Sequence, residues 1–239
     1  MSAPTDALRD LTTTGTTHSR FIGVRPRFVF RHFDKVVRDG IPFVAVPAAL
    51  ALVPMLFGYW VVAIPFLFVA AFMAFFFRDP RRQAPNTAGI VVAPADGRVT
   101  RVKVAGGDDG TKSLVSIFLS PLDVHVNRAP IAGTIEKIDY RSGKFLMATS
   151  ERARDENEQN TLTIAGADIT VKCSQIAGIL ARRIVCWKRE GDRLECGERF
   201  GMIKFGSRTD LMLPSTVEIL VKEGMHVRGG ITVIGKIAE

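Results

Sequence analysis

Hydrophobic and polar positions divide the chain into two unlike parts. Residues 41–77 read IPFVAVPAALALVPMLFGYWVVAIPFLFVAAFMAFFF and contain no charged side chain. From Gly89 onward, short β-branched runs are separated by glycines and polar residues, as in SLVSIFLS and DITVKCSQI. A long apolar run predicts helices in an apolar environment, whereas short alternating runs predict strands. We therefore expect a mainly β protein, of sandwich or barrel type, that is preceded by an N-terminal hydrophobic helical hairpin.

The hairpin prediction follows from the length of the apolar run. As one straight helix it would extend about 55 Å, whereas the hydrocarbon core of a membrane is about 30 Å thick. Pro54 and Gly58 lie near its middle, where the chain can reverse, and arginines flank both of its ends. Because basic flanks favour the cytoplasmic side, we expect a membrane hairpin with both ends on that face. Each arm is short for a full crossing, so a re-entrant hairpin stays open, as does a buried helical pair in a soluble core.

Composition divides the chain further. Residues 1–40 are polar and then basic, which predicts a disordered N-terminal segment; residues 41–77 form the membrane-associated segment, and residues 78–239 a β-rich domain. The formal net charge of +8 favours an anionic partner. Aromatic residues concentrate in the apolar run rather than among the basic residues, so a membrane surface is favoured over nucleic acid. Three cysteines without a CxxC pair indicate reduced thiols.

Residues suited to chemistry occur at three places in the β-rich part. Asp96 lies in APADGRV, and His125 lies in LSPLDVHVNRAP, where strand alternation would put Asp123, His125 and Asn127 on one face. The third place is GMIKFGSRTDL, where a strand-like run breaks at Gly206-Ser207. A plain turn is the alternative interpretation of the first and third, because Asp-Gly and Gly-Ser are ordinary turn pairs.

Histidines limit the choice of a general base. Of the four, His18 and His32 lie outside the β-rich part, which leaves His125 and His226, and His125 has the more polar surroundings. No histidine has metal-ligand spacing to another histidine or to a cysteine, so no metal site is expected. An Asp, His and Ser set is sufficient for nucleophilic chemistry but does not identify a reaction.

Several segments together resemble one family. In order along residues 75–236 they are FFRDPRR, VVAPADGRV, IFLSPLDVHVNRAPIAG, GKFLMA, ENEQN, QIAGILARRIV, GERFGMIKFGSRTDLMLP and VRGGITVIGKI. This set is similar to the pyruvoyl-dependent phosphatidylserine decarboxylases, specifically the short prokaryotic type. No single segment is specific, but the ordered set is.

The resemblance implies a self-processing carboxy-lyase of phospholipid biosynthesis. The proenzyme would cut itself between Gly206 and Ser207 into a β chain, 1–206, and an α chain, 207–239. Ser207 would become a covalent pyruvoyl group that forms a Schiff base with the amine of phosphatidylserine, and carbon dioxide and phosphatidylethanolamine would be released. No metal and no pyridoxal phosphate would be needed. The two chains would stay together, and the family often forms larger oligomers.

The family's functional residues map unevenly onto this chain. Its aspartate in DGRV falls on Asp96 and its serine on Ser207. Longer relatives carry two histidines three residues apart; here the first matches His125, but Arg128 occupies the second position. The base for self-cleavage therefore stays open between His125 and another group. Arg128, whose guanidinium remains protonated, is expected with Asn127 to bind the substrate phosphate or carboxylate.

Two other classes of protein contain sequence segments similar to parts of this chain. The segments APADGRVTRV and VKEGMHVRGGITVIGKI resemble half-repeats of barrel-sandwich-hybrid domains, which would make the chain a membrane-anchored adaptor without catalysis. Zinc endopeptidases of the β-rich, cell-wall-cleaving kind can begin strands similarly, but their histidine and aspartate ligand motifs are missing here. An adaptor would have no reason to be cut at Gly206.

Overall fold

The computed structural model describes residues 36–104, 112–150, 152–179 and 183–238. All elements below belong to one compact unit, Phe33–Glu239. The predicted disordered tail, most of the basic stretch, and the histidines at positions 18 and 32 lie outside the described residues.

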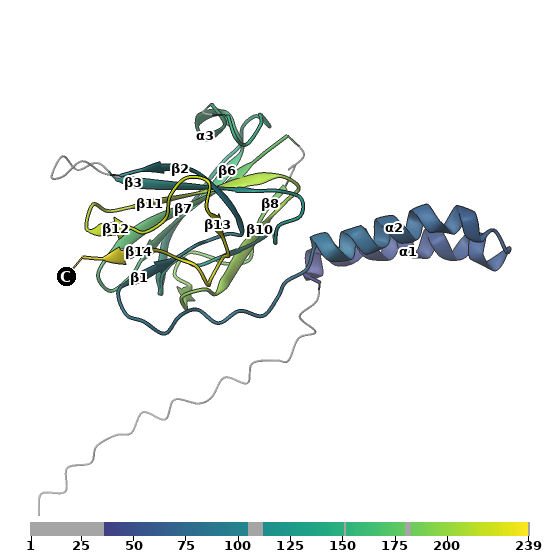
Figure 1. Cartoon of the computed structure of the whole chain (residues 1–239), viewed down its shortest axis with the longest axis horizontal. Helices are drawn as coiled ribbons and strands as arrows, with labels where there is room; N and C mark the ends of the chain where they lie inside the picture. The colour runs from purple at the N-terminus through teal and green to yellow at the C-terminus, as the bar shows by residue number, and fades with distance from the viewer. Residues whose placement is uncertain (1–35, 105–111, 151, 180–182, 239) are drawn as a thin grey trace, which may run out of the picture. The chain divides into compact units, whose positions relative to one another are not determined.

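The apolar run folds as a helical hairpin. A 3-10 turn, Arg38–Gly40, leads into α1 (Ile41–Leu56), and α2 (Trp60–Phe76) runs back beside it (Figure 1). The chain reverses between the helices at Gly58, whose φ of 79° is one that glycine adopts without steric strain. The predicted hairpin is therefore confirmed.

The hairpin exposes most of its large apolar side chains instead of burying them. Leu56 is 82% exposed, Val61 79% and Phe68 72%. The stretch Arg38–Leu56 is long and apolar enough to cross a membrane, whereas α2, with 17 residues, is slightly shorter than such a span. Exposed apolar area is unfavourable in water at about 25 cal/mol per Å². The alternative of a buried helical pair in a soluble core is therefore wrong.

The rest of the unit is built from short strands and one short helix. In chain order they are β1 (Ile90–Val92), β2 (Gly97–Lys103), β3 (Ser113–Leu119), β4 (Val126–Arg128), β5 (Gly133–Arg141), α3 (Ala153–Glu156), β6 (Gln159–Ala165), β7 (Thr170–Ala177), β8 (Arg183–Cys186), β9 (Arg193–Leu194), β10 (Arg199–Lys204), β11 (Ser207–Leu213), β12 (Val217–Ile219), β13 (His226–Val227) and β14 (Val233–Ile237).

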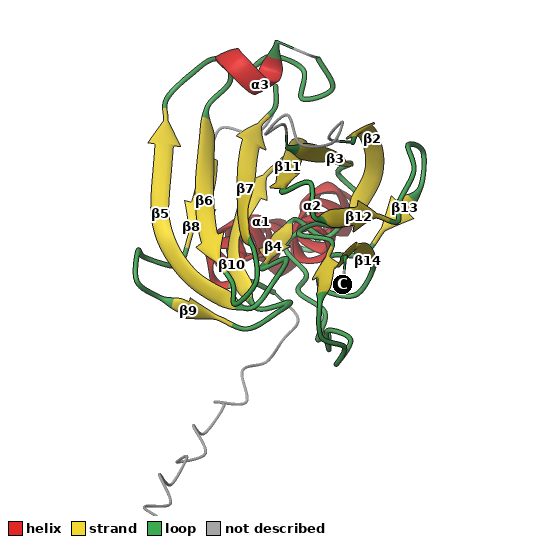
Figure 2. Cartoon of the chain, turned by 90° about the vertical axis from the view of Figure 1, so that its left-hand side faces the viewer, coloured by secondary structure: helices red, strands yellow, loops and turns green. Residues whose placement is uncertain are grey.

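These strands form three antiparallel sheets. The largest has eight strands in the order β13-β2-β3-β11-β7-β6-β5-β9, and its long strands β5, β6 and β7 lie side by side in Figure 2. Two smaller sheets have the orders β1-β14-β12 and β4-β10-β8. The mainly β fold class is confirmed.

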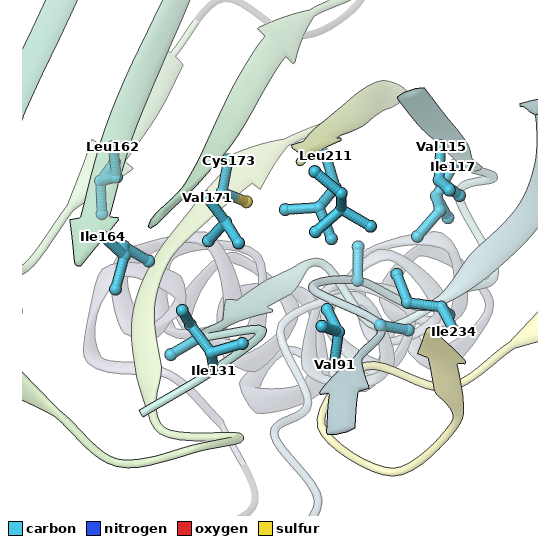
Figure 3. Packing of buried hydrophobic residues seen from close by; sticks show 14 of the residues in the cluster. Val91, Val115, Ile117, Ile131, Leu162, Ile164, Val171, Cys173, Leu211 and Ile234 are labelled. Carbon is cyan, nitrogen blue, oxygen red and sulfur yellow. The ribbon is translucent and has the colours of Figure 1, made fainter. Parts of the chain in front are cut away.

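The main core lies between the curled eight-stranded sheet and the β1-β14-β12 sheet. Strand β6 alternates between buried and half-buried residues, so that Leu162 and Ile164 point into this core. Val91 and Ile234 enter it from the small sheet, and Leu211 enters it from β11 (Figure 3). Inward residues at every second position of a strand are what the sequence pattern predicted.

Candidate active site

The break at Gly206-Ser207 is a corner between two sheets. Strand β10 pairs with β4 and β8 in a small sheet, while β11 pairs with β3 and β7 in the eight-stranded sheet. The chain changes sheets at Phe205 and Gly206, where φ is 65° and 62°. Two successive residues of positive φ make a sharp change of direction, which two consecutive strands in different sheets require. The plain hairpin turn is therefore wrong as an interpretation of this segment.

The corner has an unfavourable backbone conformation at Phe205, and a neighbouring glycine leaves room for it. Phe205 is not a glycine, so its left-handed backbone conformation costs about 1–3 kcal/mol. A Cβ added to Gly206 would meet no atom within 4 Å, so glycine is favoured there by its φ rather than by lack of space. Space is limiting at Gly178, where a Cβ would lie 2.3 Å from the carbonyl oxygen of Gly206. Gly178 therefore makes room for that carbonyl.

Ser207 begins β11 directly after the corner. Its backbone lies between Leu119 of β3 and Ala177 of β7, and the residue is fully buried. Its hydroxyl has no hydrogen-bond partner. Because a buried hydroxyl usually finds a partner, an unpartnered one directly after the Phe205-Gly206 corner makes Ser207 a candidate for chemistry.

His125 immediately precedes β4 and is also fully buried. Its Nδ1 lies 3.0 Å from the carbonyl oxygen of Asp123, which can only accept, so Nδ1 carries the proton and Nε2 carries the lone pair. Nε2 has no partner. Burial lowers the pKa of His125 to about 4, although the bond to Asp123 and nearby carboxylates partly oppose that shift. At neutral pH the imidazole is therefore a neutral base with a free lone pair.

Asp96 is held by other groups. Its carboxylate pairs with the guanidinium of Arg82 through both oxygens and accepts a hydrogen bond of 2.8 Å from the backbone N–H of Gly229. Among the described residues, no hydrogen bond joins Asp96 to His125 or His125 to Ser207. Asp96 acts on His125 through its charge, which raises the histidine pKa. The predicted roles of these three residues stay predictions.

The two residues expected to bind substrate are bonded within the protein. Asn127 donates to the hydroxyl of Thr209 at 3.0 Å and accepts from Gln175 at 2.9 Å. Arg128 points elsewhere, and its guanidinium bonds Asp79 at 2.7 Å and the carbonyl oxygen of Gly197 at 3.2 Å. Their role toward substrate stays a prediction.

The second candidate base lies outside the buried site. His226, in β13, is exposed, and its Nε2 is 3.1 Å from a carboxylate oxygen of Asp123. Asp123 lies in the turn before β4 and not in a strand, where it also binds Ser120. The expected shared strand face is therefore wrong, because β4 begins only at Val126, after both Asp123 and His125, and the turn directs the Asp123 carboxylate toward β13.

Sequence reasoning missed the partners of these residues. Arg82 and Asp79 come from the segment that follows α2, and Asp79 also binds Arg199 at 2.5 Å. Phe76, the last residue of α2, packs its ring against His125 with centroids 4.1 Å apart. The signal available in the sequence was the junction FFRDPRR, in which the aromatic end of the apolar run directly adjoins a cluster of charged residues. In the described part of the chain, no three His, Cys, Asp or Glu side chains gather as metal ligands.

Comparisons with a family model and with individual relatives indicate the same family. The family model described as phosphatidylserine decarboxylase matches residues 69–235. A phosphatidylserine decarboxylase proenzyme of Solibacter usitatus is 49% identical over 203 residues, covering 84% of this chain and 97% of the relative. Proenzymes of the same name from Granulibacter bethesdensis and Gluconobacter oxydans are 47% and 50% identical, covering 82% and 70% of this chain and 83% and 77% of the relatives.

The matched range contains the corner at Gly206-Ser207 and every candidate residue of the buried site. The match therefore covers the part of the chain in which the orphaned hydroxyl and the free imidazole nitrogen lie. As the sequence resemblance predicted, the chain belongs to the phosphatidylserine decarboxylase family of carboxy-lyases.

Proposed function

We propose that this chain converts phosphatidylserine to phosphatidylethanolamine and carbon dioxide, after cutting its own backbone between Gly206 and Ser207. Family membership supports the reaction and its place in phospholipid biosynthesis. The observation that carries the cleavage is the buried Ser207 hydroxyl, which lacks a partner and follows a glycine of positive φ.

Cleavage begins when the Ser207 oxygen attacks the carbonyl carbon of Gly206 and its proton passes to Nε2 of His125. The peptide C–N bond breaks as the nitrogen takes a proton, and the acyl group is then an ester of the serine oxygen. Loss of the Ser207 α-proton expels the Gly206 carboxylate and leaves dehydroalanine at position 207. One water then enters and one ammonia leaves, which makes the pyruvoyl group.

The residues around the corner fit this product. The future pyruvoyl position is buried between β3 and β7, and Gly178 keeps the adjoining carbonyl unobstructed. The pyruvoyl group, which needs neither a metal nor pyridoxal phosphate, supplies an electron-withdrawing carbonyl to the substrate amine. His125, neutral above about pH 4, holds or moves a proton at its Nε2.

Strand pairing explains why the two products of cleavage would stay together. β11, which would begin the α chain, is hydrogen-bonded along its length to β3 and β7 of the β chain. Farther on, β14 pairs with β1 and β13 pairs with β2. The α and β chains therefore form a heterodimer without a new interface, while further oligomers are expected from the family alone.

The hairpin would bring the enzyme to its lipid substrate. Helices of 16 and 17 residues extend about 24–26 Å, which is slightly less than the hydrocarbon core. The exposed apolar side chains favour insertion, and the basic residues at both ends favour the anionic cytoplasmic face of the cell membrane.

Intact-mass measurement together with a decarboxylase assay tests the proposal. Active enzyme, purified in detergent and assayed on phosphatidylserine vesicles, should contain two chains divided between residues 206 and 207, with a keto-acyl group at the start of the smaller one. Activity in a single unbroken chain would contradict the mechanism. An unbroken chain without activity would favour the membrane-anchored adaptor.

A further inference from the structure

The last residue of the hydrophobic hairpin lies inside the candidate active site. Phe76 ends α2 and is fully buried. Its ring contacts the imidazole of His125, with centroids 4.1 Å apart, and stacks on the ring of Phe205, with centroids 4.5 Å apart and an interplanar angle of 22°. Phe76 thus touches both the proposed base and the residue before Gly206.

We propose that Phe76 is a positioning residue for self-cleavage, which holds the His125 imidazole and the Phe205-Gly206 corner in one aromatic stack. The inference rests on the proposed function, because it assigns Phe76 to that reaction. It adds that the hairpin belongs to the processing apparatus and is not only a membrane anchor.

The contacts of Phe76 with Phe205 and with His125 support the positioning role. Phe205 is held in a left-handed conformation, and its ring packs on Phe76 and edge-on against Phe77, 6.1 Å away. His125 is fixed at one edge by the bond from Nδ1 to Asp123 and on one face by Phe76. Only its Nε2 is left without a partner. Removing the Phe76 ring frees both the imidazole and the corner to turn.

Phe76 also keeps water from the imidazole. Burial is the largest cause of the lowered pKa of His125, and Phe76 supplies part of that burial. The charged groups that act on the imidazole are Asp123 before β4 and Asp96 before β2, which raise its pKa, and Arg78 after α2, which lowers it. Without the Phe76 ring, water reaches the imidazole and its pKa moves from about 4 toward the ordinary 6.5.

The consequence is a shift of the acid limb of the pH–rate profile, which is the pH range over which acidification slows cleavage. A base of pKa 4 is almost wholly neutral at pH 5.5, whereas one of pKa 6.5 is neutral in about one molecule in ten. Phe76→Ala should therefore slow cleavage up to about tenfold more at pH 5.5 than at pH 7.5. Phe76→Leu keeps most of the apolar volume, so it should slow cleavage with a smaller shift of the acid limb.

The experiment follows the full chain, made by cell-free synthesis into detergent, as it converts to two fragments across a pH series. Phe68→Ala is the matched control, because Phe68 is in the same helix but 72% exposed. It should leave the rate and the acid limb unchanged. Wild-type rate and acid limb in Phe76→Ala would overturn the proposal, as would equal slowing by Phe68→Ala.

A second measurement tests the role of Phe76 without relying on cleavage, in case Phe76→Ala folds but is not cut. In an uncleavable Ser207→Ala background, the His125 imidazole is titrated by NMR with and without Phe76→Ala, and His125→Gln identifies its signal. The pKa of His125 should rise in the double variant; an unchanged value would overturn the proposal. If wild-type chain is never cut between 206 and 207, the proposed function fails instead, whatever Phe76 does.

Discussion

The hairpin and the eight-stranded sheet use the same kinds of residue in opposite ways. Leu52 and Val61 of the hairpin are 57% and 79% exposed, whereas Leu162 and Val171 of the sheet are fully buried. Burial from water stabilises the sheet side chains by about 1.5–3 kcal/mol each. The hairpin gains no such stabilisation in water, and the proposed insertion into lipid would supply it. Apolar content alone does not distinguish these regions, and exposure does.

The two regions meet in one small cluster. Phe76 and Phe77 of the hairpin end are buried with Met202 of β10, apart from the main core. The segment after α2 then crosses to the β-rich part through two buried pairs, Asp79 with Arg128 and Arg82 with Asp96. The hairpin is thus anchored to the strands that carry the candidate site, and variants can separate what each region contributes.

The largest effect is expected at Ser207, which should separate chemistry from membrane attachment. Ser207→Ala removes the oxygen proposed to attack Gly206, so self-cleavage and decarboxylation should both be lost completely while membrane association is kept. Electrophoresis, the vesicle assay and vesicle flotation measure the three properties. Ser116→Ala is a matched control, because Ser116 is also buried with an unpartnered hydroxyl, in the neighbouring strand β3. It should still be cut; decarboxylation by Ser207→Ala would refute the assignment.

Charges placed in the hairpin should have the opposite effect, because they should weaken membrane association and leave self-cleavage intact. Leu52→Asp with Phe68→Asp places two carboxylates on exposed apolar positions, each unfavourable in the membrane by about 2.5–3.5 kcal/mol. Vesicle partition should fall by about a thousandfold or more, while self-cleavage in detergent continues. Leu220→Asp, on an exposed position of the β-rich part, should change partition little. Equal membrane binding by the double variant would remove the distinction between the regions.

The sequence predicted a region well where the interactions that form it are between residues close together in the chain, and poorly where they join distant segments. The hairpin was predictable because its signals are local: a charge-free run and a glycine at the reversal. The corner at Gly206 was not, because β10 and β11 find their partners in strands far apart in the chain. Asp96 was indicated by its motif, but its partner Arg82 lies on the other side of β1, where only the folded chain brings it close.

A smaller effect, on stability rather than attachment, is expected where the hairpin segment docks. Arg128→Leu leaves the buried carboxylate of Asp79 with Arg199 alone, and Arg199 is half exposed. We expect the free energy of unfolding to fall by about 3 kcal/mol, the low end for a broken buried pair. Denaturant unfolding of the Ser207→Ala chain in detergent measures it. Lys137→Ala, which breaks an exposed pair with Asp139, should cause no measurable change. Equal stability of Arg128→Leu would mean that Asp79 is not buried in solution.

The smallest effect is a pH dependence confined to the β-rich part. The pKa of His125 is about 4 in the folded chain and about 6.5 when unfolded, so acidification protonates the unfolded state first. Stability from this group is complete above pH 6.5 and declines as pH falls toward 4. Between pH 7.5 and pH 5.5 we expect the uncleavable Ser207→Ala chain to lose about 1.4 kcal/mol from His125.

Replacing the histidine isolates this contribution from other titrating groups. In the same Ser207→Ala background, His125→Gln should reduce the loss of stability between the two pH values by that amount. Residues 41–76 contain no side chain that titrates in this range, so vesicle partition should change much less than stability does. An equal pH dependence with glutamine at this position would mean that the imidazole is solvated in the folded chain. The difference between the hairpin, which has no titrating side chain in this pH range, and the β-rich part, whose stability depends on pH, would then have to come from groups other than His125.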